Sequence, residues 1–402
     1  MRFEILFYLA LVAGVYPTWR IFRDLGDITQ LFLRVDRAAM LNTIRWEWKL
    51  VGAAAAAITL AGLCHFMFDV GNRTLLYLVG GASFLMIGLP LLWVHVGLRN
   101  QQHSANFYSI EEARHYVRPE TSVIVLEHNG AARAHPDYEV WRPHLVGTRD
   151  GLGGENIILS YCALTHLGQG FKAEIDGQAV ELEVLAQTGN NLVMRDNTTM
   201  EPIQQLHGFR HCDGNTKTGM AYWPSFRMTF RAYQKAYPDG EVFLNRIKPF
   251  SSNPFLWIFD HLVDGLFYIV VTANDRSTSP VMPTIGTPDP RLQSNTYIWG
   301  VNIGDDYVAY TEDFVRGREL INTSVGGRKI VVNYNKEFES LGIWYNDYDL
   351  PIGEIDFWGN SEQGKHKRVE TVRPGAYWCV WAHYFPHTDI NRVQTLAKKQ
   401  AA

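Results

Sequence analysis

Residues 50–98, LVGAAAAAITLAGLCHFMFDVGNRTLLYLVGGASFLMIGLPLLWVHVGL, contain two apolar runs separated by a short polar turn. The runs cover residues 50–70 and 74–98, and each is long enough to cross a bilayer, for which about 20 residues suffice. Small residues such as Gly52 and Gly80 allow helix backbones to approach closely. Because so few residues join the runs, we expect an antiparallel pair of membrane helices.

A third apolar stretch, residues 3–22, precedes this pair. It lacks a clear basic segment at its start and a small-residue cleavage site before Arg23, so we expect it to be retained. Residues 27–39 carry apolar side chains at helical spacing and predict an amphipathic helix on the membrane surface. Residues 1–100 are therefore predicted to form an α-helical anchor of about three transmembrane helices in a lipid bilayer, with an interfacial helix.

Composition excludes some classes of partner. The formal net charge of -4 over 402 residues is spread without basic blocks, and no stripe of lysine and arginine interleaves with aromatic residues. We therefore exclude nucleic acid as a partner. The four cysteines form no CxxC pair, which argues against a disulfide framework.

Beyond Ser104 the pattern changes to short β-type runs between turns rich in Gly, Asn and Asp. These runs predict a mainly β (α+β) soluble domain. The clearest of them are residues 123–127, 157–161, 179–185, 308–311 and 330–333.

Two stretches of the soluble part are similar to each other. VIVLEHNGAARAHP and IWGVNIGDDYVAY each lead through a Gly-Gly pair to an apolar strand. We expect two similar β-rich repeats, at residues 105–250 and 281–395, that pack as a pseudo-symmetric core. The alternative is chance similarity between β-rich sequences. The landmarks at nearly constant spacing are Ala134 with Ala309, Tyr161 with Tyr334, and Gly168 with Gly342.

One helix is expected at the end of the first repeat. Pro224 and Ser225 open a run in which aromatic residues recur on one helical face. The Pro-Asp-Gly turn at residues 238–240 closes this run. A helix is therefore predicted over residues 224–237.

Residues 251–280 form an apolar insertion that resembles a fourth membrane helix. Asp260 and Asp264 lie in its middle, and each would cost about 2.5–3.5 kcal/mol at the centre of a bilayer. We therefore expect a buried or interfacial helix that runs into a strand and presses the soluble domain against the membrane.

Two groups of residues could bind a metal. Cys162 and His166 lie in the turn after a predicted buried strand, where a thiolate and an imidazole could bind copper or zinc or act as nucleophile and base. His207, His211 and Cys212 offer an i, i+4 histidine pair and a thiol, although Gly208 favours a loop. The structural alternative for both groups is a buried cysteine beside loop histidines.

The soluble part resembles a bacterial family, the domain of unknown function 3179. The resemblance spans most of residues 120–390. The segments that carry it are VIVLEHNGAARAHP, IILSYCAL, NNLVMRD, WPSFRMTFRAYQKAYPDGEV, DPRL ahead of YIWGV, and YWCVWAHYFPHTDI. The family has no established activity, so the resemblance implies a fold and supplies no reaction.

The chain departs from the family pattern at one turn. Where family members have a Cys-Pro-Leu-Cys-like sequence, residues 162–165 read CALT. Chemistry that needs two cysteines at this turn therefore cannot operate here in that form. The insertion at residues 251–280 is also peculiar to this chain.

Two arguments about orientation oppose each other. Family members are similar to exported or membrane-anchored proteins, which implies a periplasmic soluble domain on the bacterial inner membrane. The positive-inside rule instead favours the cytoplasm, because the loop after the first helix is basic. We expect the periplasmic arrangement. The basic residues concerned are Arg23, Arg34, Arg37, Arg45 and Lys49.

Three functions remain open at this stage. The first is a membrane-anchored accessory protein whose β domain binds a metal, a small ligand or a protein partner at the membrane surface. The second is a thiol- or metal-dependent enzyme that uses Cys162 and His166. The third is a structural subunit that associates with other membrane-protein subunits, for which the small-residue helices provide a packing surface.

Overall fold

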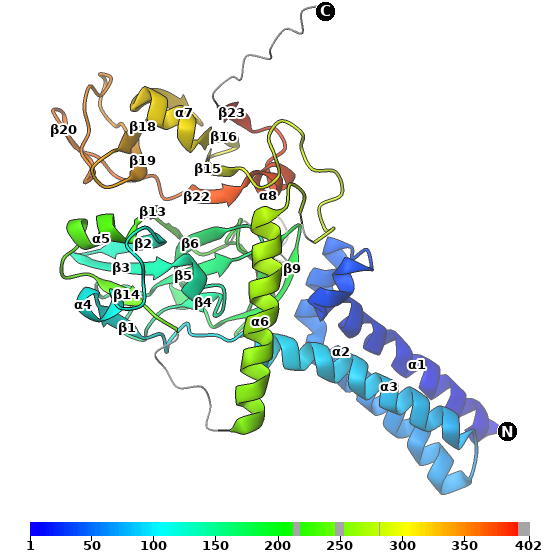
Figure 1. The fold of residues 1–402 in the computed structure, drawn as a ribbon. Coiled ribbons are helices and arrows are strands. Elements are labelled where there is room, and N and C mark those ends of the chain that lie inside the picture. Colours follow the sequence, from blue (N-terminus) through cyan, green and yellow to red (C-terminus); the bar gives the residue numbers. More distant parts are fainter. Residues whose placement is uncertain (212–217, 246–252, 281, 393–402) are drawn as a thin grey trace, which may run out of the picture. The chain divides into compact units, whose positions relative to one another are not determined.

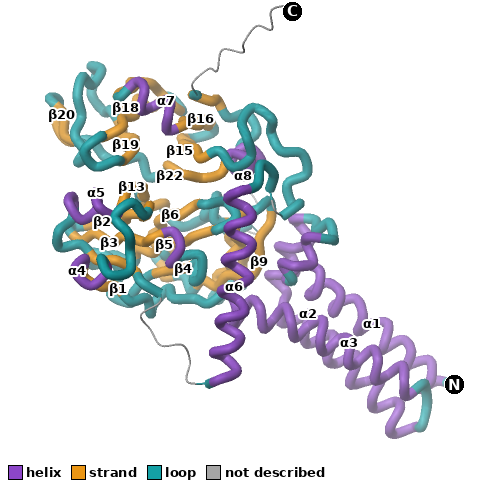
Figure 2. The backbone as a smooth tube through the Cα atoms, viewed as in Figure 1, coloured by secondary structure: helices purple, strands orange, loops and turns teal. Residues whose placement is uncertain are grey.

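The computed structural model describes residues 1–211, 218–245, 253–280 and 282–392 (Figure 1). The chain divides into two units. Unit 1 comprises residues 1–100, 175–219 and 282–284, and unit 2 comprises residues 101–174, 220–281 and 285–402. Helices make up most of unit 1, whereas strands and loops dominate unit 2 (Figure 2).

The N-terminal region of unit 1 is helical, as predicted. Its helices are α1 (Arg2–Leu25), α2 (Arg37–Phe68) and α3 (Arg73–Leu92), and a π-helical turn, η2 (Trp93–Gly97), continues α3. Asn72 caps the start of α3, where its side chain accepts a hydrogen bond from the Leu75 amide at 3.0 Å. All three helices are long and apolar enough to cross a membrane.

The predicted interfacial helix over residues 27–39 is wrong. Only a 3₁₀ turn forms there, η1 (Asp27–Leu31), and residues from Arg37 onward belong to α2. The reason is a helix cap at Asp36, whose extended backbone interrupts the helical pattern. Its carboxylate accepts a hydrogen bond from the Ala39 amide at 2.9 Å and so begins α2.

A three-stranded sheet completes unit 1. Its strands, in the order β11-β10-β9, are β11 (Glu201–Gln204), β10 (Asn191–Asp196) and β9 (Leu182–Thr188). An ionic network joins this sheet to the helices. Arg195 of β10 pairs with Glu47 of α2 and, at 2.9 Å, with Glu183 of β9.

His95 of η2 lies between the same two carboxylates of this network. Its ring nitrogens lie 2.7 Å from Glu47 and 2.6 Å from Glu183. Glu47 is fully buried, so its charge requires these cationic partners. The sheet of unit 1 is therefore fixed to both α2 and the end of α3.

Two of the sheets of unit 2 share a strand order, apart from an additional edge strand in the first. The first runs β1-β14-β3-β2-β13 and the second runs β23-β16-β15-β22. β14 pairs with β3 in parallel in the first sheet, and β23 pairs with β16 in parallel in the second. The pairs β3–β2 and β2–β13 of the first sheet and β16–β15 and β15–β22 of the second are antiparallel. The bounds are β1 (Phe107–Ser109), β14 (Glu241–Phe243), β3 (Ala131–Pro136), β2 (Ser122–His128), β13 (Ser225–Thr229), β23 (Asp389–Asn391), β16 (Asp306–Thr311), β15 (Tyr297–Ile303) and β22 (Val372–Tyr377).

A short helix follows the last strand of each sheet. These helices are α5 (Phe230–Ala236) after β13 and α8 (Trp378–Tyr384) after β22. The predicted helix over residues 224–237 is therefore correct only in its second half. Residues 225–229 instead pair with β2 as an antiparallel strand, and the Thr229 hydroxyl caps α5 by accepting from the Ala232 amide.

Glycine pairs occupy corresponding places after the first hairpins of the two sheets. A Cβ on Gly153 would lie 2.5 Å from the carbonyl oxygen of His128, at the end of β2. A Cβ on Gly326 would lie 2.2 Å from the carbonyl oxygen of Ile303, at the end of β15. Both glycines also have positive φ, so no other residue fits without strain.

The two apolar hairpins correspond as well, with one difference. β5 (Ile157–Cys162) pairs with β6 (Leu167–Lys172), and β18 (Arg328–Asn335) pairs with β19 (Ser340–Tyr345). Gly168 lies opposite Tyr161, but Leu341 rather than Gly342 lies opposite Tyr334. Gly168 and Gly342 therefore differ by one position in the pairing of their hairpins. That the two halves are copies of one unit stays a prediction, with which the shared strand order is compatible.

Helix α6 (Pro254–Arg276) belongs to unit 2 and is also long and apolar enough to cross a membrane. It is helical throughout residues 254–276, so the predicted change from helix to strand within this segment is wrong. Asp260 and Asp264 pair with Arg142 at 2.6 and 2.9 Å. The charges in the middle of the helix are thus compensated by the rest of unit 2, which we call the β domain.

The remaining elements are short. They are α4 (Ile110–Ala113), η3 (Asp137–Glu139), β4 (Leu145–Val146), β7 (Glu174–Ile175), β8 (Gln178–Ala179), β12 (Tyr222–Trp223), α7 (Glu312–Arg318), β17 (Leu320–Val325), β20 (Asn360–Ser361) and β21 (Gly364–Lys365).

Candidate functional site

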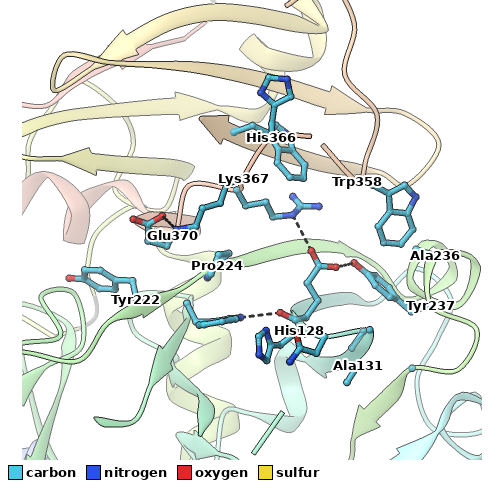
Figure 3. Close-up of a pocket in the computed structure, with 18 of the residues that line it drawn as sticks. His128, Ala131, Tyr222, Pro224, Ala236, Tyr237, Trp358, His366, Lys367 and Glu370 are labelled. Carbon is cyan, nitrogen blue, oxygen red and sulfur yellow. Dashed lines mark hydrogen bonds and ion pairs between the residues drawn. The ribbon is translucent and has the colours of Figure 1, made fainter. Parts of the chain in front are cut away.

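A cleft of about 1220 Å³ opens within unit 2 (Figure 3). Drug-sized ligands usually occupy pockets of about 300–1,000 Å³, so this cleft can hold a larger molecule. Four parts of the β domain line it, together with Trp344 of β19 and Trp358. These parts are the turn between β2 and β3, strand β12, the end of α5, and the segment of residues 365–371.

Glu127, at the end of β2, is the central carboxylate of the cleft. The Tyr237 hydroxyl donates a hydrogen bond to its Oε2 atom, and Arg368 Nε lies 3.5 Å from its Oε1 atom. That distance is long for a hydrogen bond, so the contact with Arg368 is an ion pair. The Glu127 side chain is one-third exposed. It is thus held in place and still accessible from the cleft.

Arg368 is held by aromatic rings. Its guanidinium carbon lies 4.0 Å from the ring centroid of Phe226 and 4.1 Å from that of Trp344. One of its nitrogens donates to the carbonyl oxygen of Phe357 at 2.9 Å. Burial lowers the pKa of Arg368 below its ordinary value, but a guanidinium remains protonated in proteins. Arg368 is therefore a fixed positive charge beside Glu127.

Aromatic side chains form much of the wall of the cleft. The Trp223 indole meets the His128 ring edge to face at 4.8 Å and donates to the carbonyl oxygen of Glu127 at 3.0 Å. Trp358 packs edge to face on Tyr237 at 5.2 Å. Burial and the nearby Glu127 raise the pKa of Tyr237, so its hydroxyl stays a donor at neutral pH.

Further polar groups lie along the cleft. Glu370 accepts a hydrogen bond from the Tyr345 hydroxyl at 3.3 Å, and Lys367 lies 3.7 Å from its second oxygen. The buried hydroxyl of Thr371 has no hydrogen-bond partner among the described residues. The cleft therefore combines flat apolar faces with carboxylates, cations and a hydroxyl.

The first pair of predicted site residues lies elsewhere in unit 2. Cys162 ends β5 and is buried, with its sulfur 3.3 Å from the Thr165 hydroxyl. His166 has a φ of 56°, which directs the chain back into β6. Its Nδ1 donates to the carbonyl oxygen of Gly375 at 3.1 Å, and its Nε2 lies 3.5 Å from Asp137. The imidazole thus faces a carboxylate.

Arg227 of β13 makes most of the hydrogen bonds around this histidine. Its Nη1 donates to both carboxylate oxygens of Asp137, at 2.8 and 2.6 Å. Other guanidinium nitrogens donate to the carbonyl oxygens of Pro374 and His166, at 2.9 and 2.8 Å. Burial, and then the charge of Arg227, lower the pKa of His166. The group therefore joins the first sheet to β22.

Tyrosines surround this ionic group. The His166 ring lies 4.5 Å from the ring of Tyr297 and 5.5 Å from that of Tyr377. The hydroxyl of Tyr161 is buried without a hydrogen-bond partner among the described residues. Burial, and then Asp137, raise the pKa of Tyr161 well above its ordinary value. The ionic group is therefore largely buried, although Tyr297 at its edge is exposed.

The second predicted group lies in unit 1. The rings of His207 and His211 are 6.0 Å apart, in a turn rather than a helix, as Gly208 suggests. An Arg37 nitrogen lies 3.1 Å from His211, and burial together with this charge lowers the pKa of His211 to about 4. The neighbouring guanidinium would repel a metal cation at this imidazole. Cys212 lies outside the described residues.

No group of three or more His, Cys, Asp or Glu side chains within residues 1–211, 218–245, 253–280 and 282–392 is placed to hold a metal ion. Copper or zinc binding through Cys162, His166, His207, His211 and Cys212 therefore stays a prediction without geometric support.

Sequence reasoning missed the residues that shape the cleft. Glu127, Tyr237 and Arg368 are far apart in the chain, and no spacing rule connects them. Glu127 does carry a local signal, because it is a charged residue directly after the apolar run VIVL. The run KHKR at residues 365–368 is a second signal.

No curated protein and no solved structure is significantly similar to this chain. The family described as "Protein of unknown function (DUF3179)" matches residues 102–388, which include all the residues of the cleft and of the group around Arg227. Because this match covers more than half of the sequence, the chain belongs to the DUF3179 family.

Proposed function

We propose that this protein is a binding protein anchored by α1, α2 and α3 in the bacterial inner membrane, and that its cleft binds an uncharged oligosaccharide. The observation that carries the proposal is the set of aromatic faces around the fixed Glu127–Tyr237–Arg368 group.

The aromatic walls suit the shape of a sugar. Each sugar ring has flat C–H faces that pack against an indole or phenol ring, and hydroxyl groups around its edge. Trp223, Tyr237 and Trp358 supply such rings, and Glu127 lies beside them. Pockets that orient a ligand typically combine apolar walls with a few placed polar groups.

The charges of the cleft favour an uncharged ligand. Carboxylates and cations line it in equal number. The carboxylates are Glu127, Asp239 and Glu370, and the cations are Lys365, Lys367 and Arg368. A strongly anionic or cationic ligand would meet repulsion from half of these groups. A sugar hydroxyl both donates and accepts hydrogen bonds, so it can pair with either kind.

Replacing Trp358 by alanine should weaken oligosaccharide binding about 10-fold, equivalent to about 1.4 kcal/mol, because an aromatic face of the cleft that is about one-third exposed is lost. Isothermal titration calorimetry of the full chain in mild detergent, with uncharged hexasaccharides of glucose and of N-acetylglucosamine, measures the dissociation constant. The matched control is Tyr116→Ala, an exposed aromatic residue outside the cleft. Saturable binding that Trp358→Ala leaves unchanged, or no binding of any uncharged glycan on an array, would refute the proposal.

The periplasmic orientation rests on the resemblance to exported proteins, and the positive-inside rule still opposes it. Two of the basic residues concerned have partners within unit 1. Arg45 is paired with Glu201 at 2.8 Å, and Arg37 donates to Gln204 at 3.0 Å.

A cysteine at the exposed position Leu350 provides the test of orientation. In bacterial cells with a permeabilised outer membrane, Leu350→Cys should react with a membrane-impermeant maleimide before lysis, because the soluble domain faces the periplasm. Labelling that requires lysis of the inner membrane would place the domain in the cytoplasm. The parent chain, whose described cysteines are buried, is the control.

The other two functions have less support. A thiol enzyme would need an accessible nucleophile, whereas Cys162 is only 3 % exposed. A subunit of a larger membrane complex would need an apolar contact surface, and the helices of unit 1 expose many apolar residues, as lipid contact also requires.

A further inference from the structure

Helix α6 has one face turned to the β domain, which we call the inner face. Val263 and Val271 are buried there, and Phe267 packs against the His144 ring at 5.3 Å. Asn274 donates to the carbonyl oxygen of Leu164 at 3.2 Å. With Asp260, these residues recur every three or four positions, so they follow one stripe of the helix.

The opposite stripe, which we call the outer face, has no cover among the described residues. Its members are large and apolar, and they also recur every three or four positions. They are Phe255, Ile258, Leu262, Leu266 and Ile269, with exposed fractions of 44–81 %. Soluble proteins rarely leave so continuous an apolar stripe in water, which indicates a binding partner.

The ion pairs of Arg142 show how the helix can lie in a membrane. Asp260 and Asp264 are in the middle of α6, and Arg142, which holds both, belongs to the β domain. If the middle of α6 crossed the bilayer centre, Arg142 and its surroundings would have to enter the hydrocarbon as well. A helix that lies along the surface needs no such burial, because its polar side stays with the domain.

The chain also keeps unit 2 near the membrane. Only residues 98–100 separate the last residue of η2, Gly97, from the first residue of unit 2, Gln101. A linker of this length spans at most about 15 Å even when fully extended. The first residue of unit 2 therefore lies within about 15 Å of the end of the proposed anchor.

We propose that the outer face of α6 lies in the lipid interface as a second, non-spanning membrane contact, an inference that rests on the proposed anchoring of α1, α2 and α3. The lipid acyl chains would cover Phe255, Ile258 and Leu262, while the inner face keeps its contacts with the β domain. The cleft would then be held by two contacts at a constant orientation to the membrane, instead of swinging on a single linker.

The test measures membrane depth with nitroxide spin labels on the full chain in phosphatidylcholine–phosphatidylglycerol vesicles. Single cysteines replace Ile258, Leu262 and Ile269 in a background in which the four native cysteines are alanine. Leu85→Cys on α3 is the control for a membrane-embedded site, and Leu350→Cys is the control for a site in water. Collisions with oxygen report lipid, and collisions with a nickel chelate report water.

We expect all three α6 labels to collide more often with oxygen than with the nickel chelate, at a similar and shallow depth. A profile that reaches the depth of the Leu85 label would make α6 a spanning helix and overturn the inference. Labels that behave like Leu350, or that are shielded from both reagents by protein, would overturn it too. If the Leu85 label itself lies in water, the proposed anchoring fails, so the two failures can be told apart.

Discussion

Replacing Arg227 by methionine should lower the free energy of unfolding of the β domain by about 3–5 kcal/mol. Arg227 and Asp137 are both largely buried, and the guanidinium holds both carboxylate oxygens. Without Arg227 the Asp137 charge remains in the interior uncompensated, and two carbonyl oxygens lose their donor. Urea titration of the full chain in mild detergent, followed by tryptophan fluorescence, measures the change.

A double variant separates this explanation from simple loss of packing. Adding Asp137→Asn to Arg227→Met removes the stranded charge and should restore a substantial part of the lost stability. The control is Arg231→Met, which breaks the exposed pair with Glu339 and should change stability little. A double variant as unstable as Arg227→Met alone would show that the charge is not the cause.

Mild acid should destabilise the β domain through two buried histidines. Burial lowers the pKa of His135 to about 3 and that of His144 to about 4. In the unfolded chain both side chains take up a proton near pH 6.5, whereas in the folded state they stay neutral. The unfolded state therefore binds more protons, and stability falls as the pH falls below about 6.5. Between pH 6.5 and 5 the loss is roughly 2 kcal/mol for each histidine.

Urea titrations at several pH values check this slope. Each neutral ring donates from Nδ1 to a carbonyl oxygen, that of Ile124 for His135 and that of Tyr161 for His144. His144→Gln keeps a donor without a titratable group, so it should flatten part of the dependence on pH and leave the part due to His135 and the other buried histidines. The exposed His115, replaced by Gln, should leave the slope unchanged. Equal slopes in all three proteins would contradict the assignment.

The N-terminal helices could be predicted because their sequence permits little else. An apolar run as long as residues 74–98 is not compatible with a half-buried strand or a loop. The helix over residues 224–237 was predicted less well for a physical reason. Phe226 and Phe230 are four positions apart, which fits a helix, but the sheet edge at β2 recruits residues 225–229 as a strand. Tertiary pairing there overrides the local pattern.

The site illustrates a different limit. The sequence identifies His166 as a residue with chemistry, yet its ring meets Asp137 and the carbonyl oxygen of Gly375, which come from distant parts of the chain. Glu127, Tyr237 and Arg368 meet only because the turn after β2, the end of α5 and residues 365–371 converge in the fold. Spacing rules describe neighbours within one helix or strand, so they cannot find contacts between distant segments.

The length and continuity of helix α2 have a mechanical consequence. Its 32 residues extend for about 48 Å, whereas the hydrocarbon core of a bilayer is about 30 Å thick. The helix is continuous, and its first turns are fastened to the sheet of unit 1 through Arg45 and Glu47. A rod without a hinge transmits any change of tilt along its length. If α2 spans a membrane as proposed, a thinner bilayer would increase the tilt of the helix and rotate the attached sheet together with it.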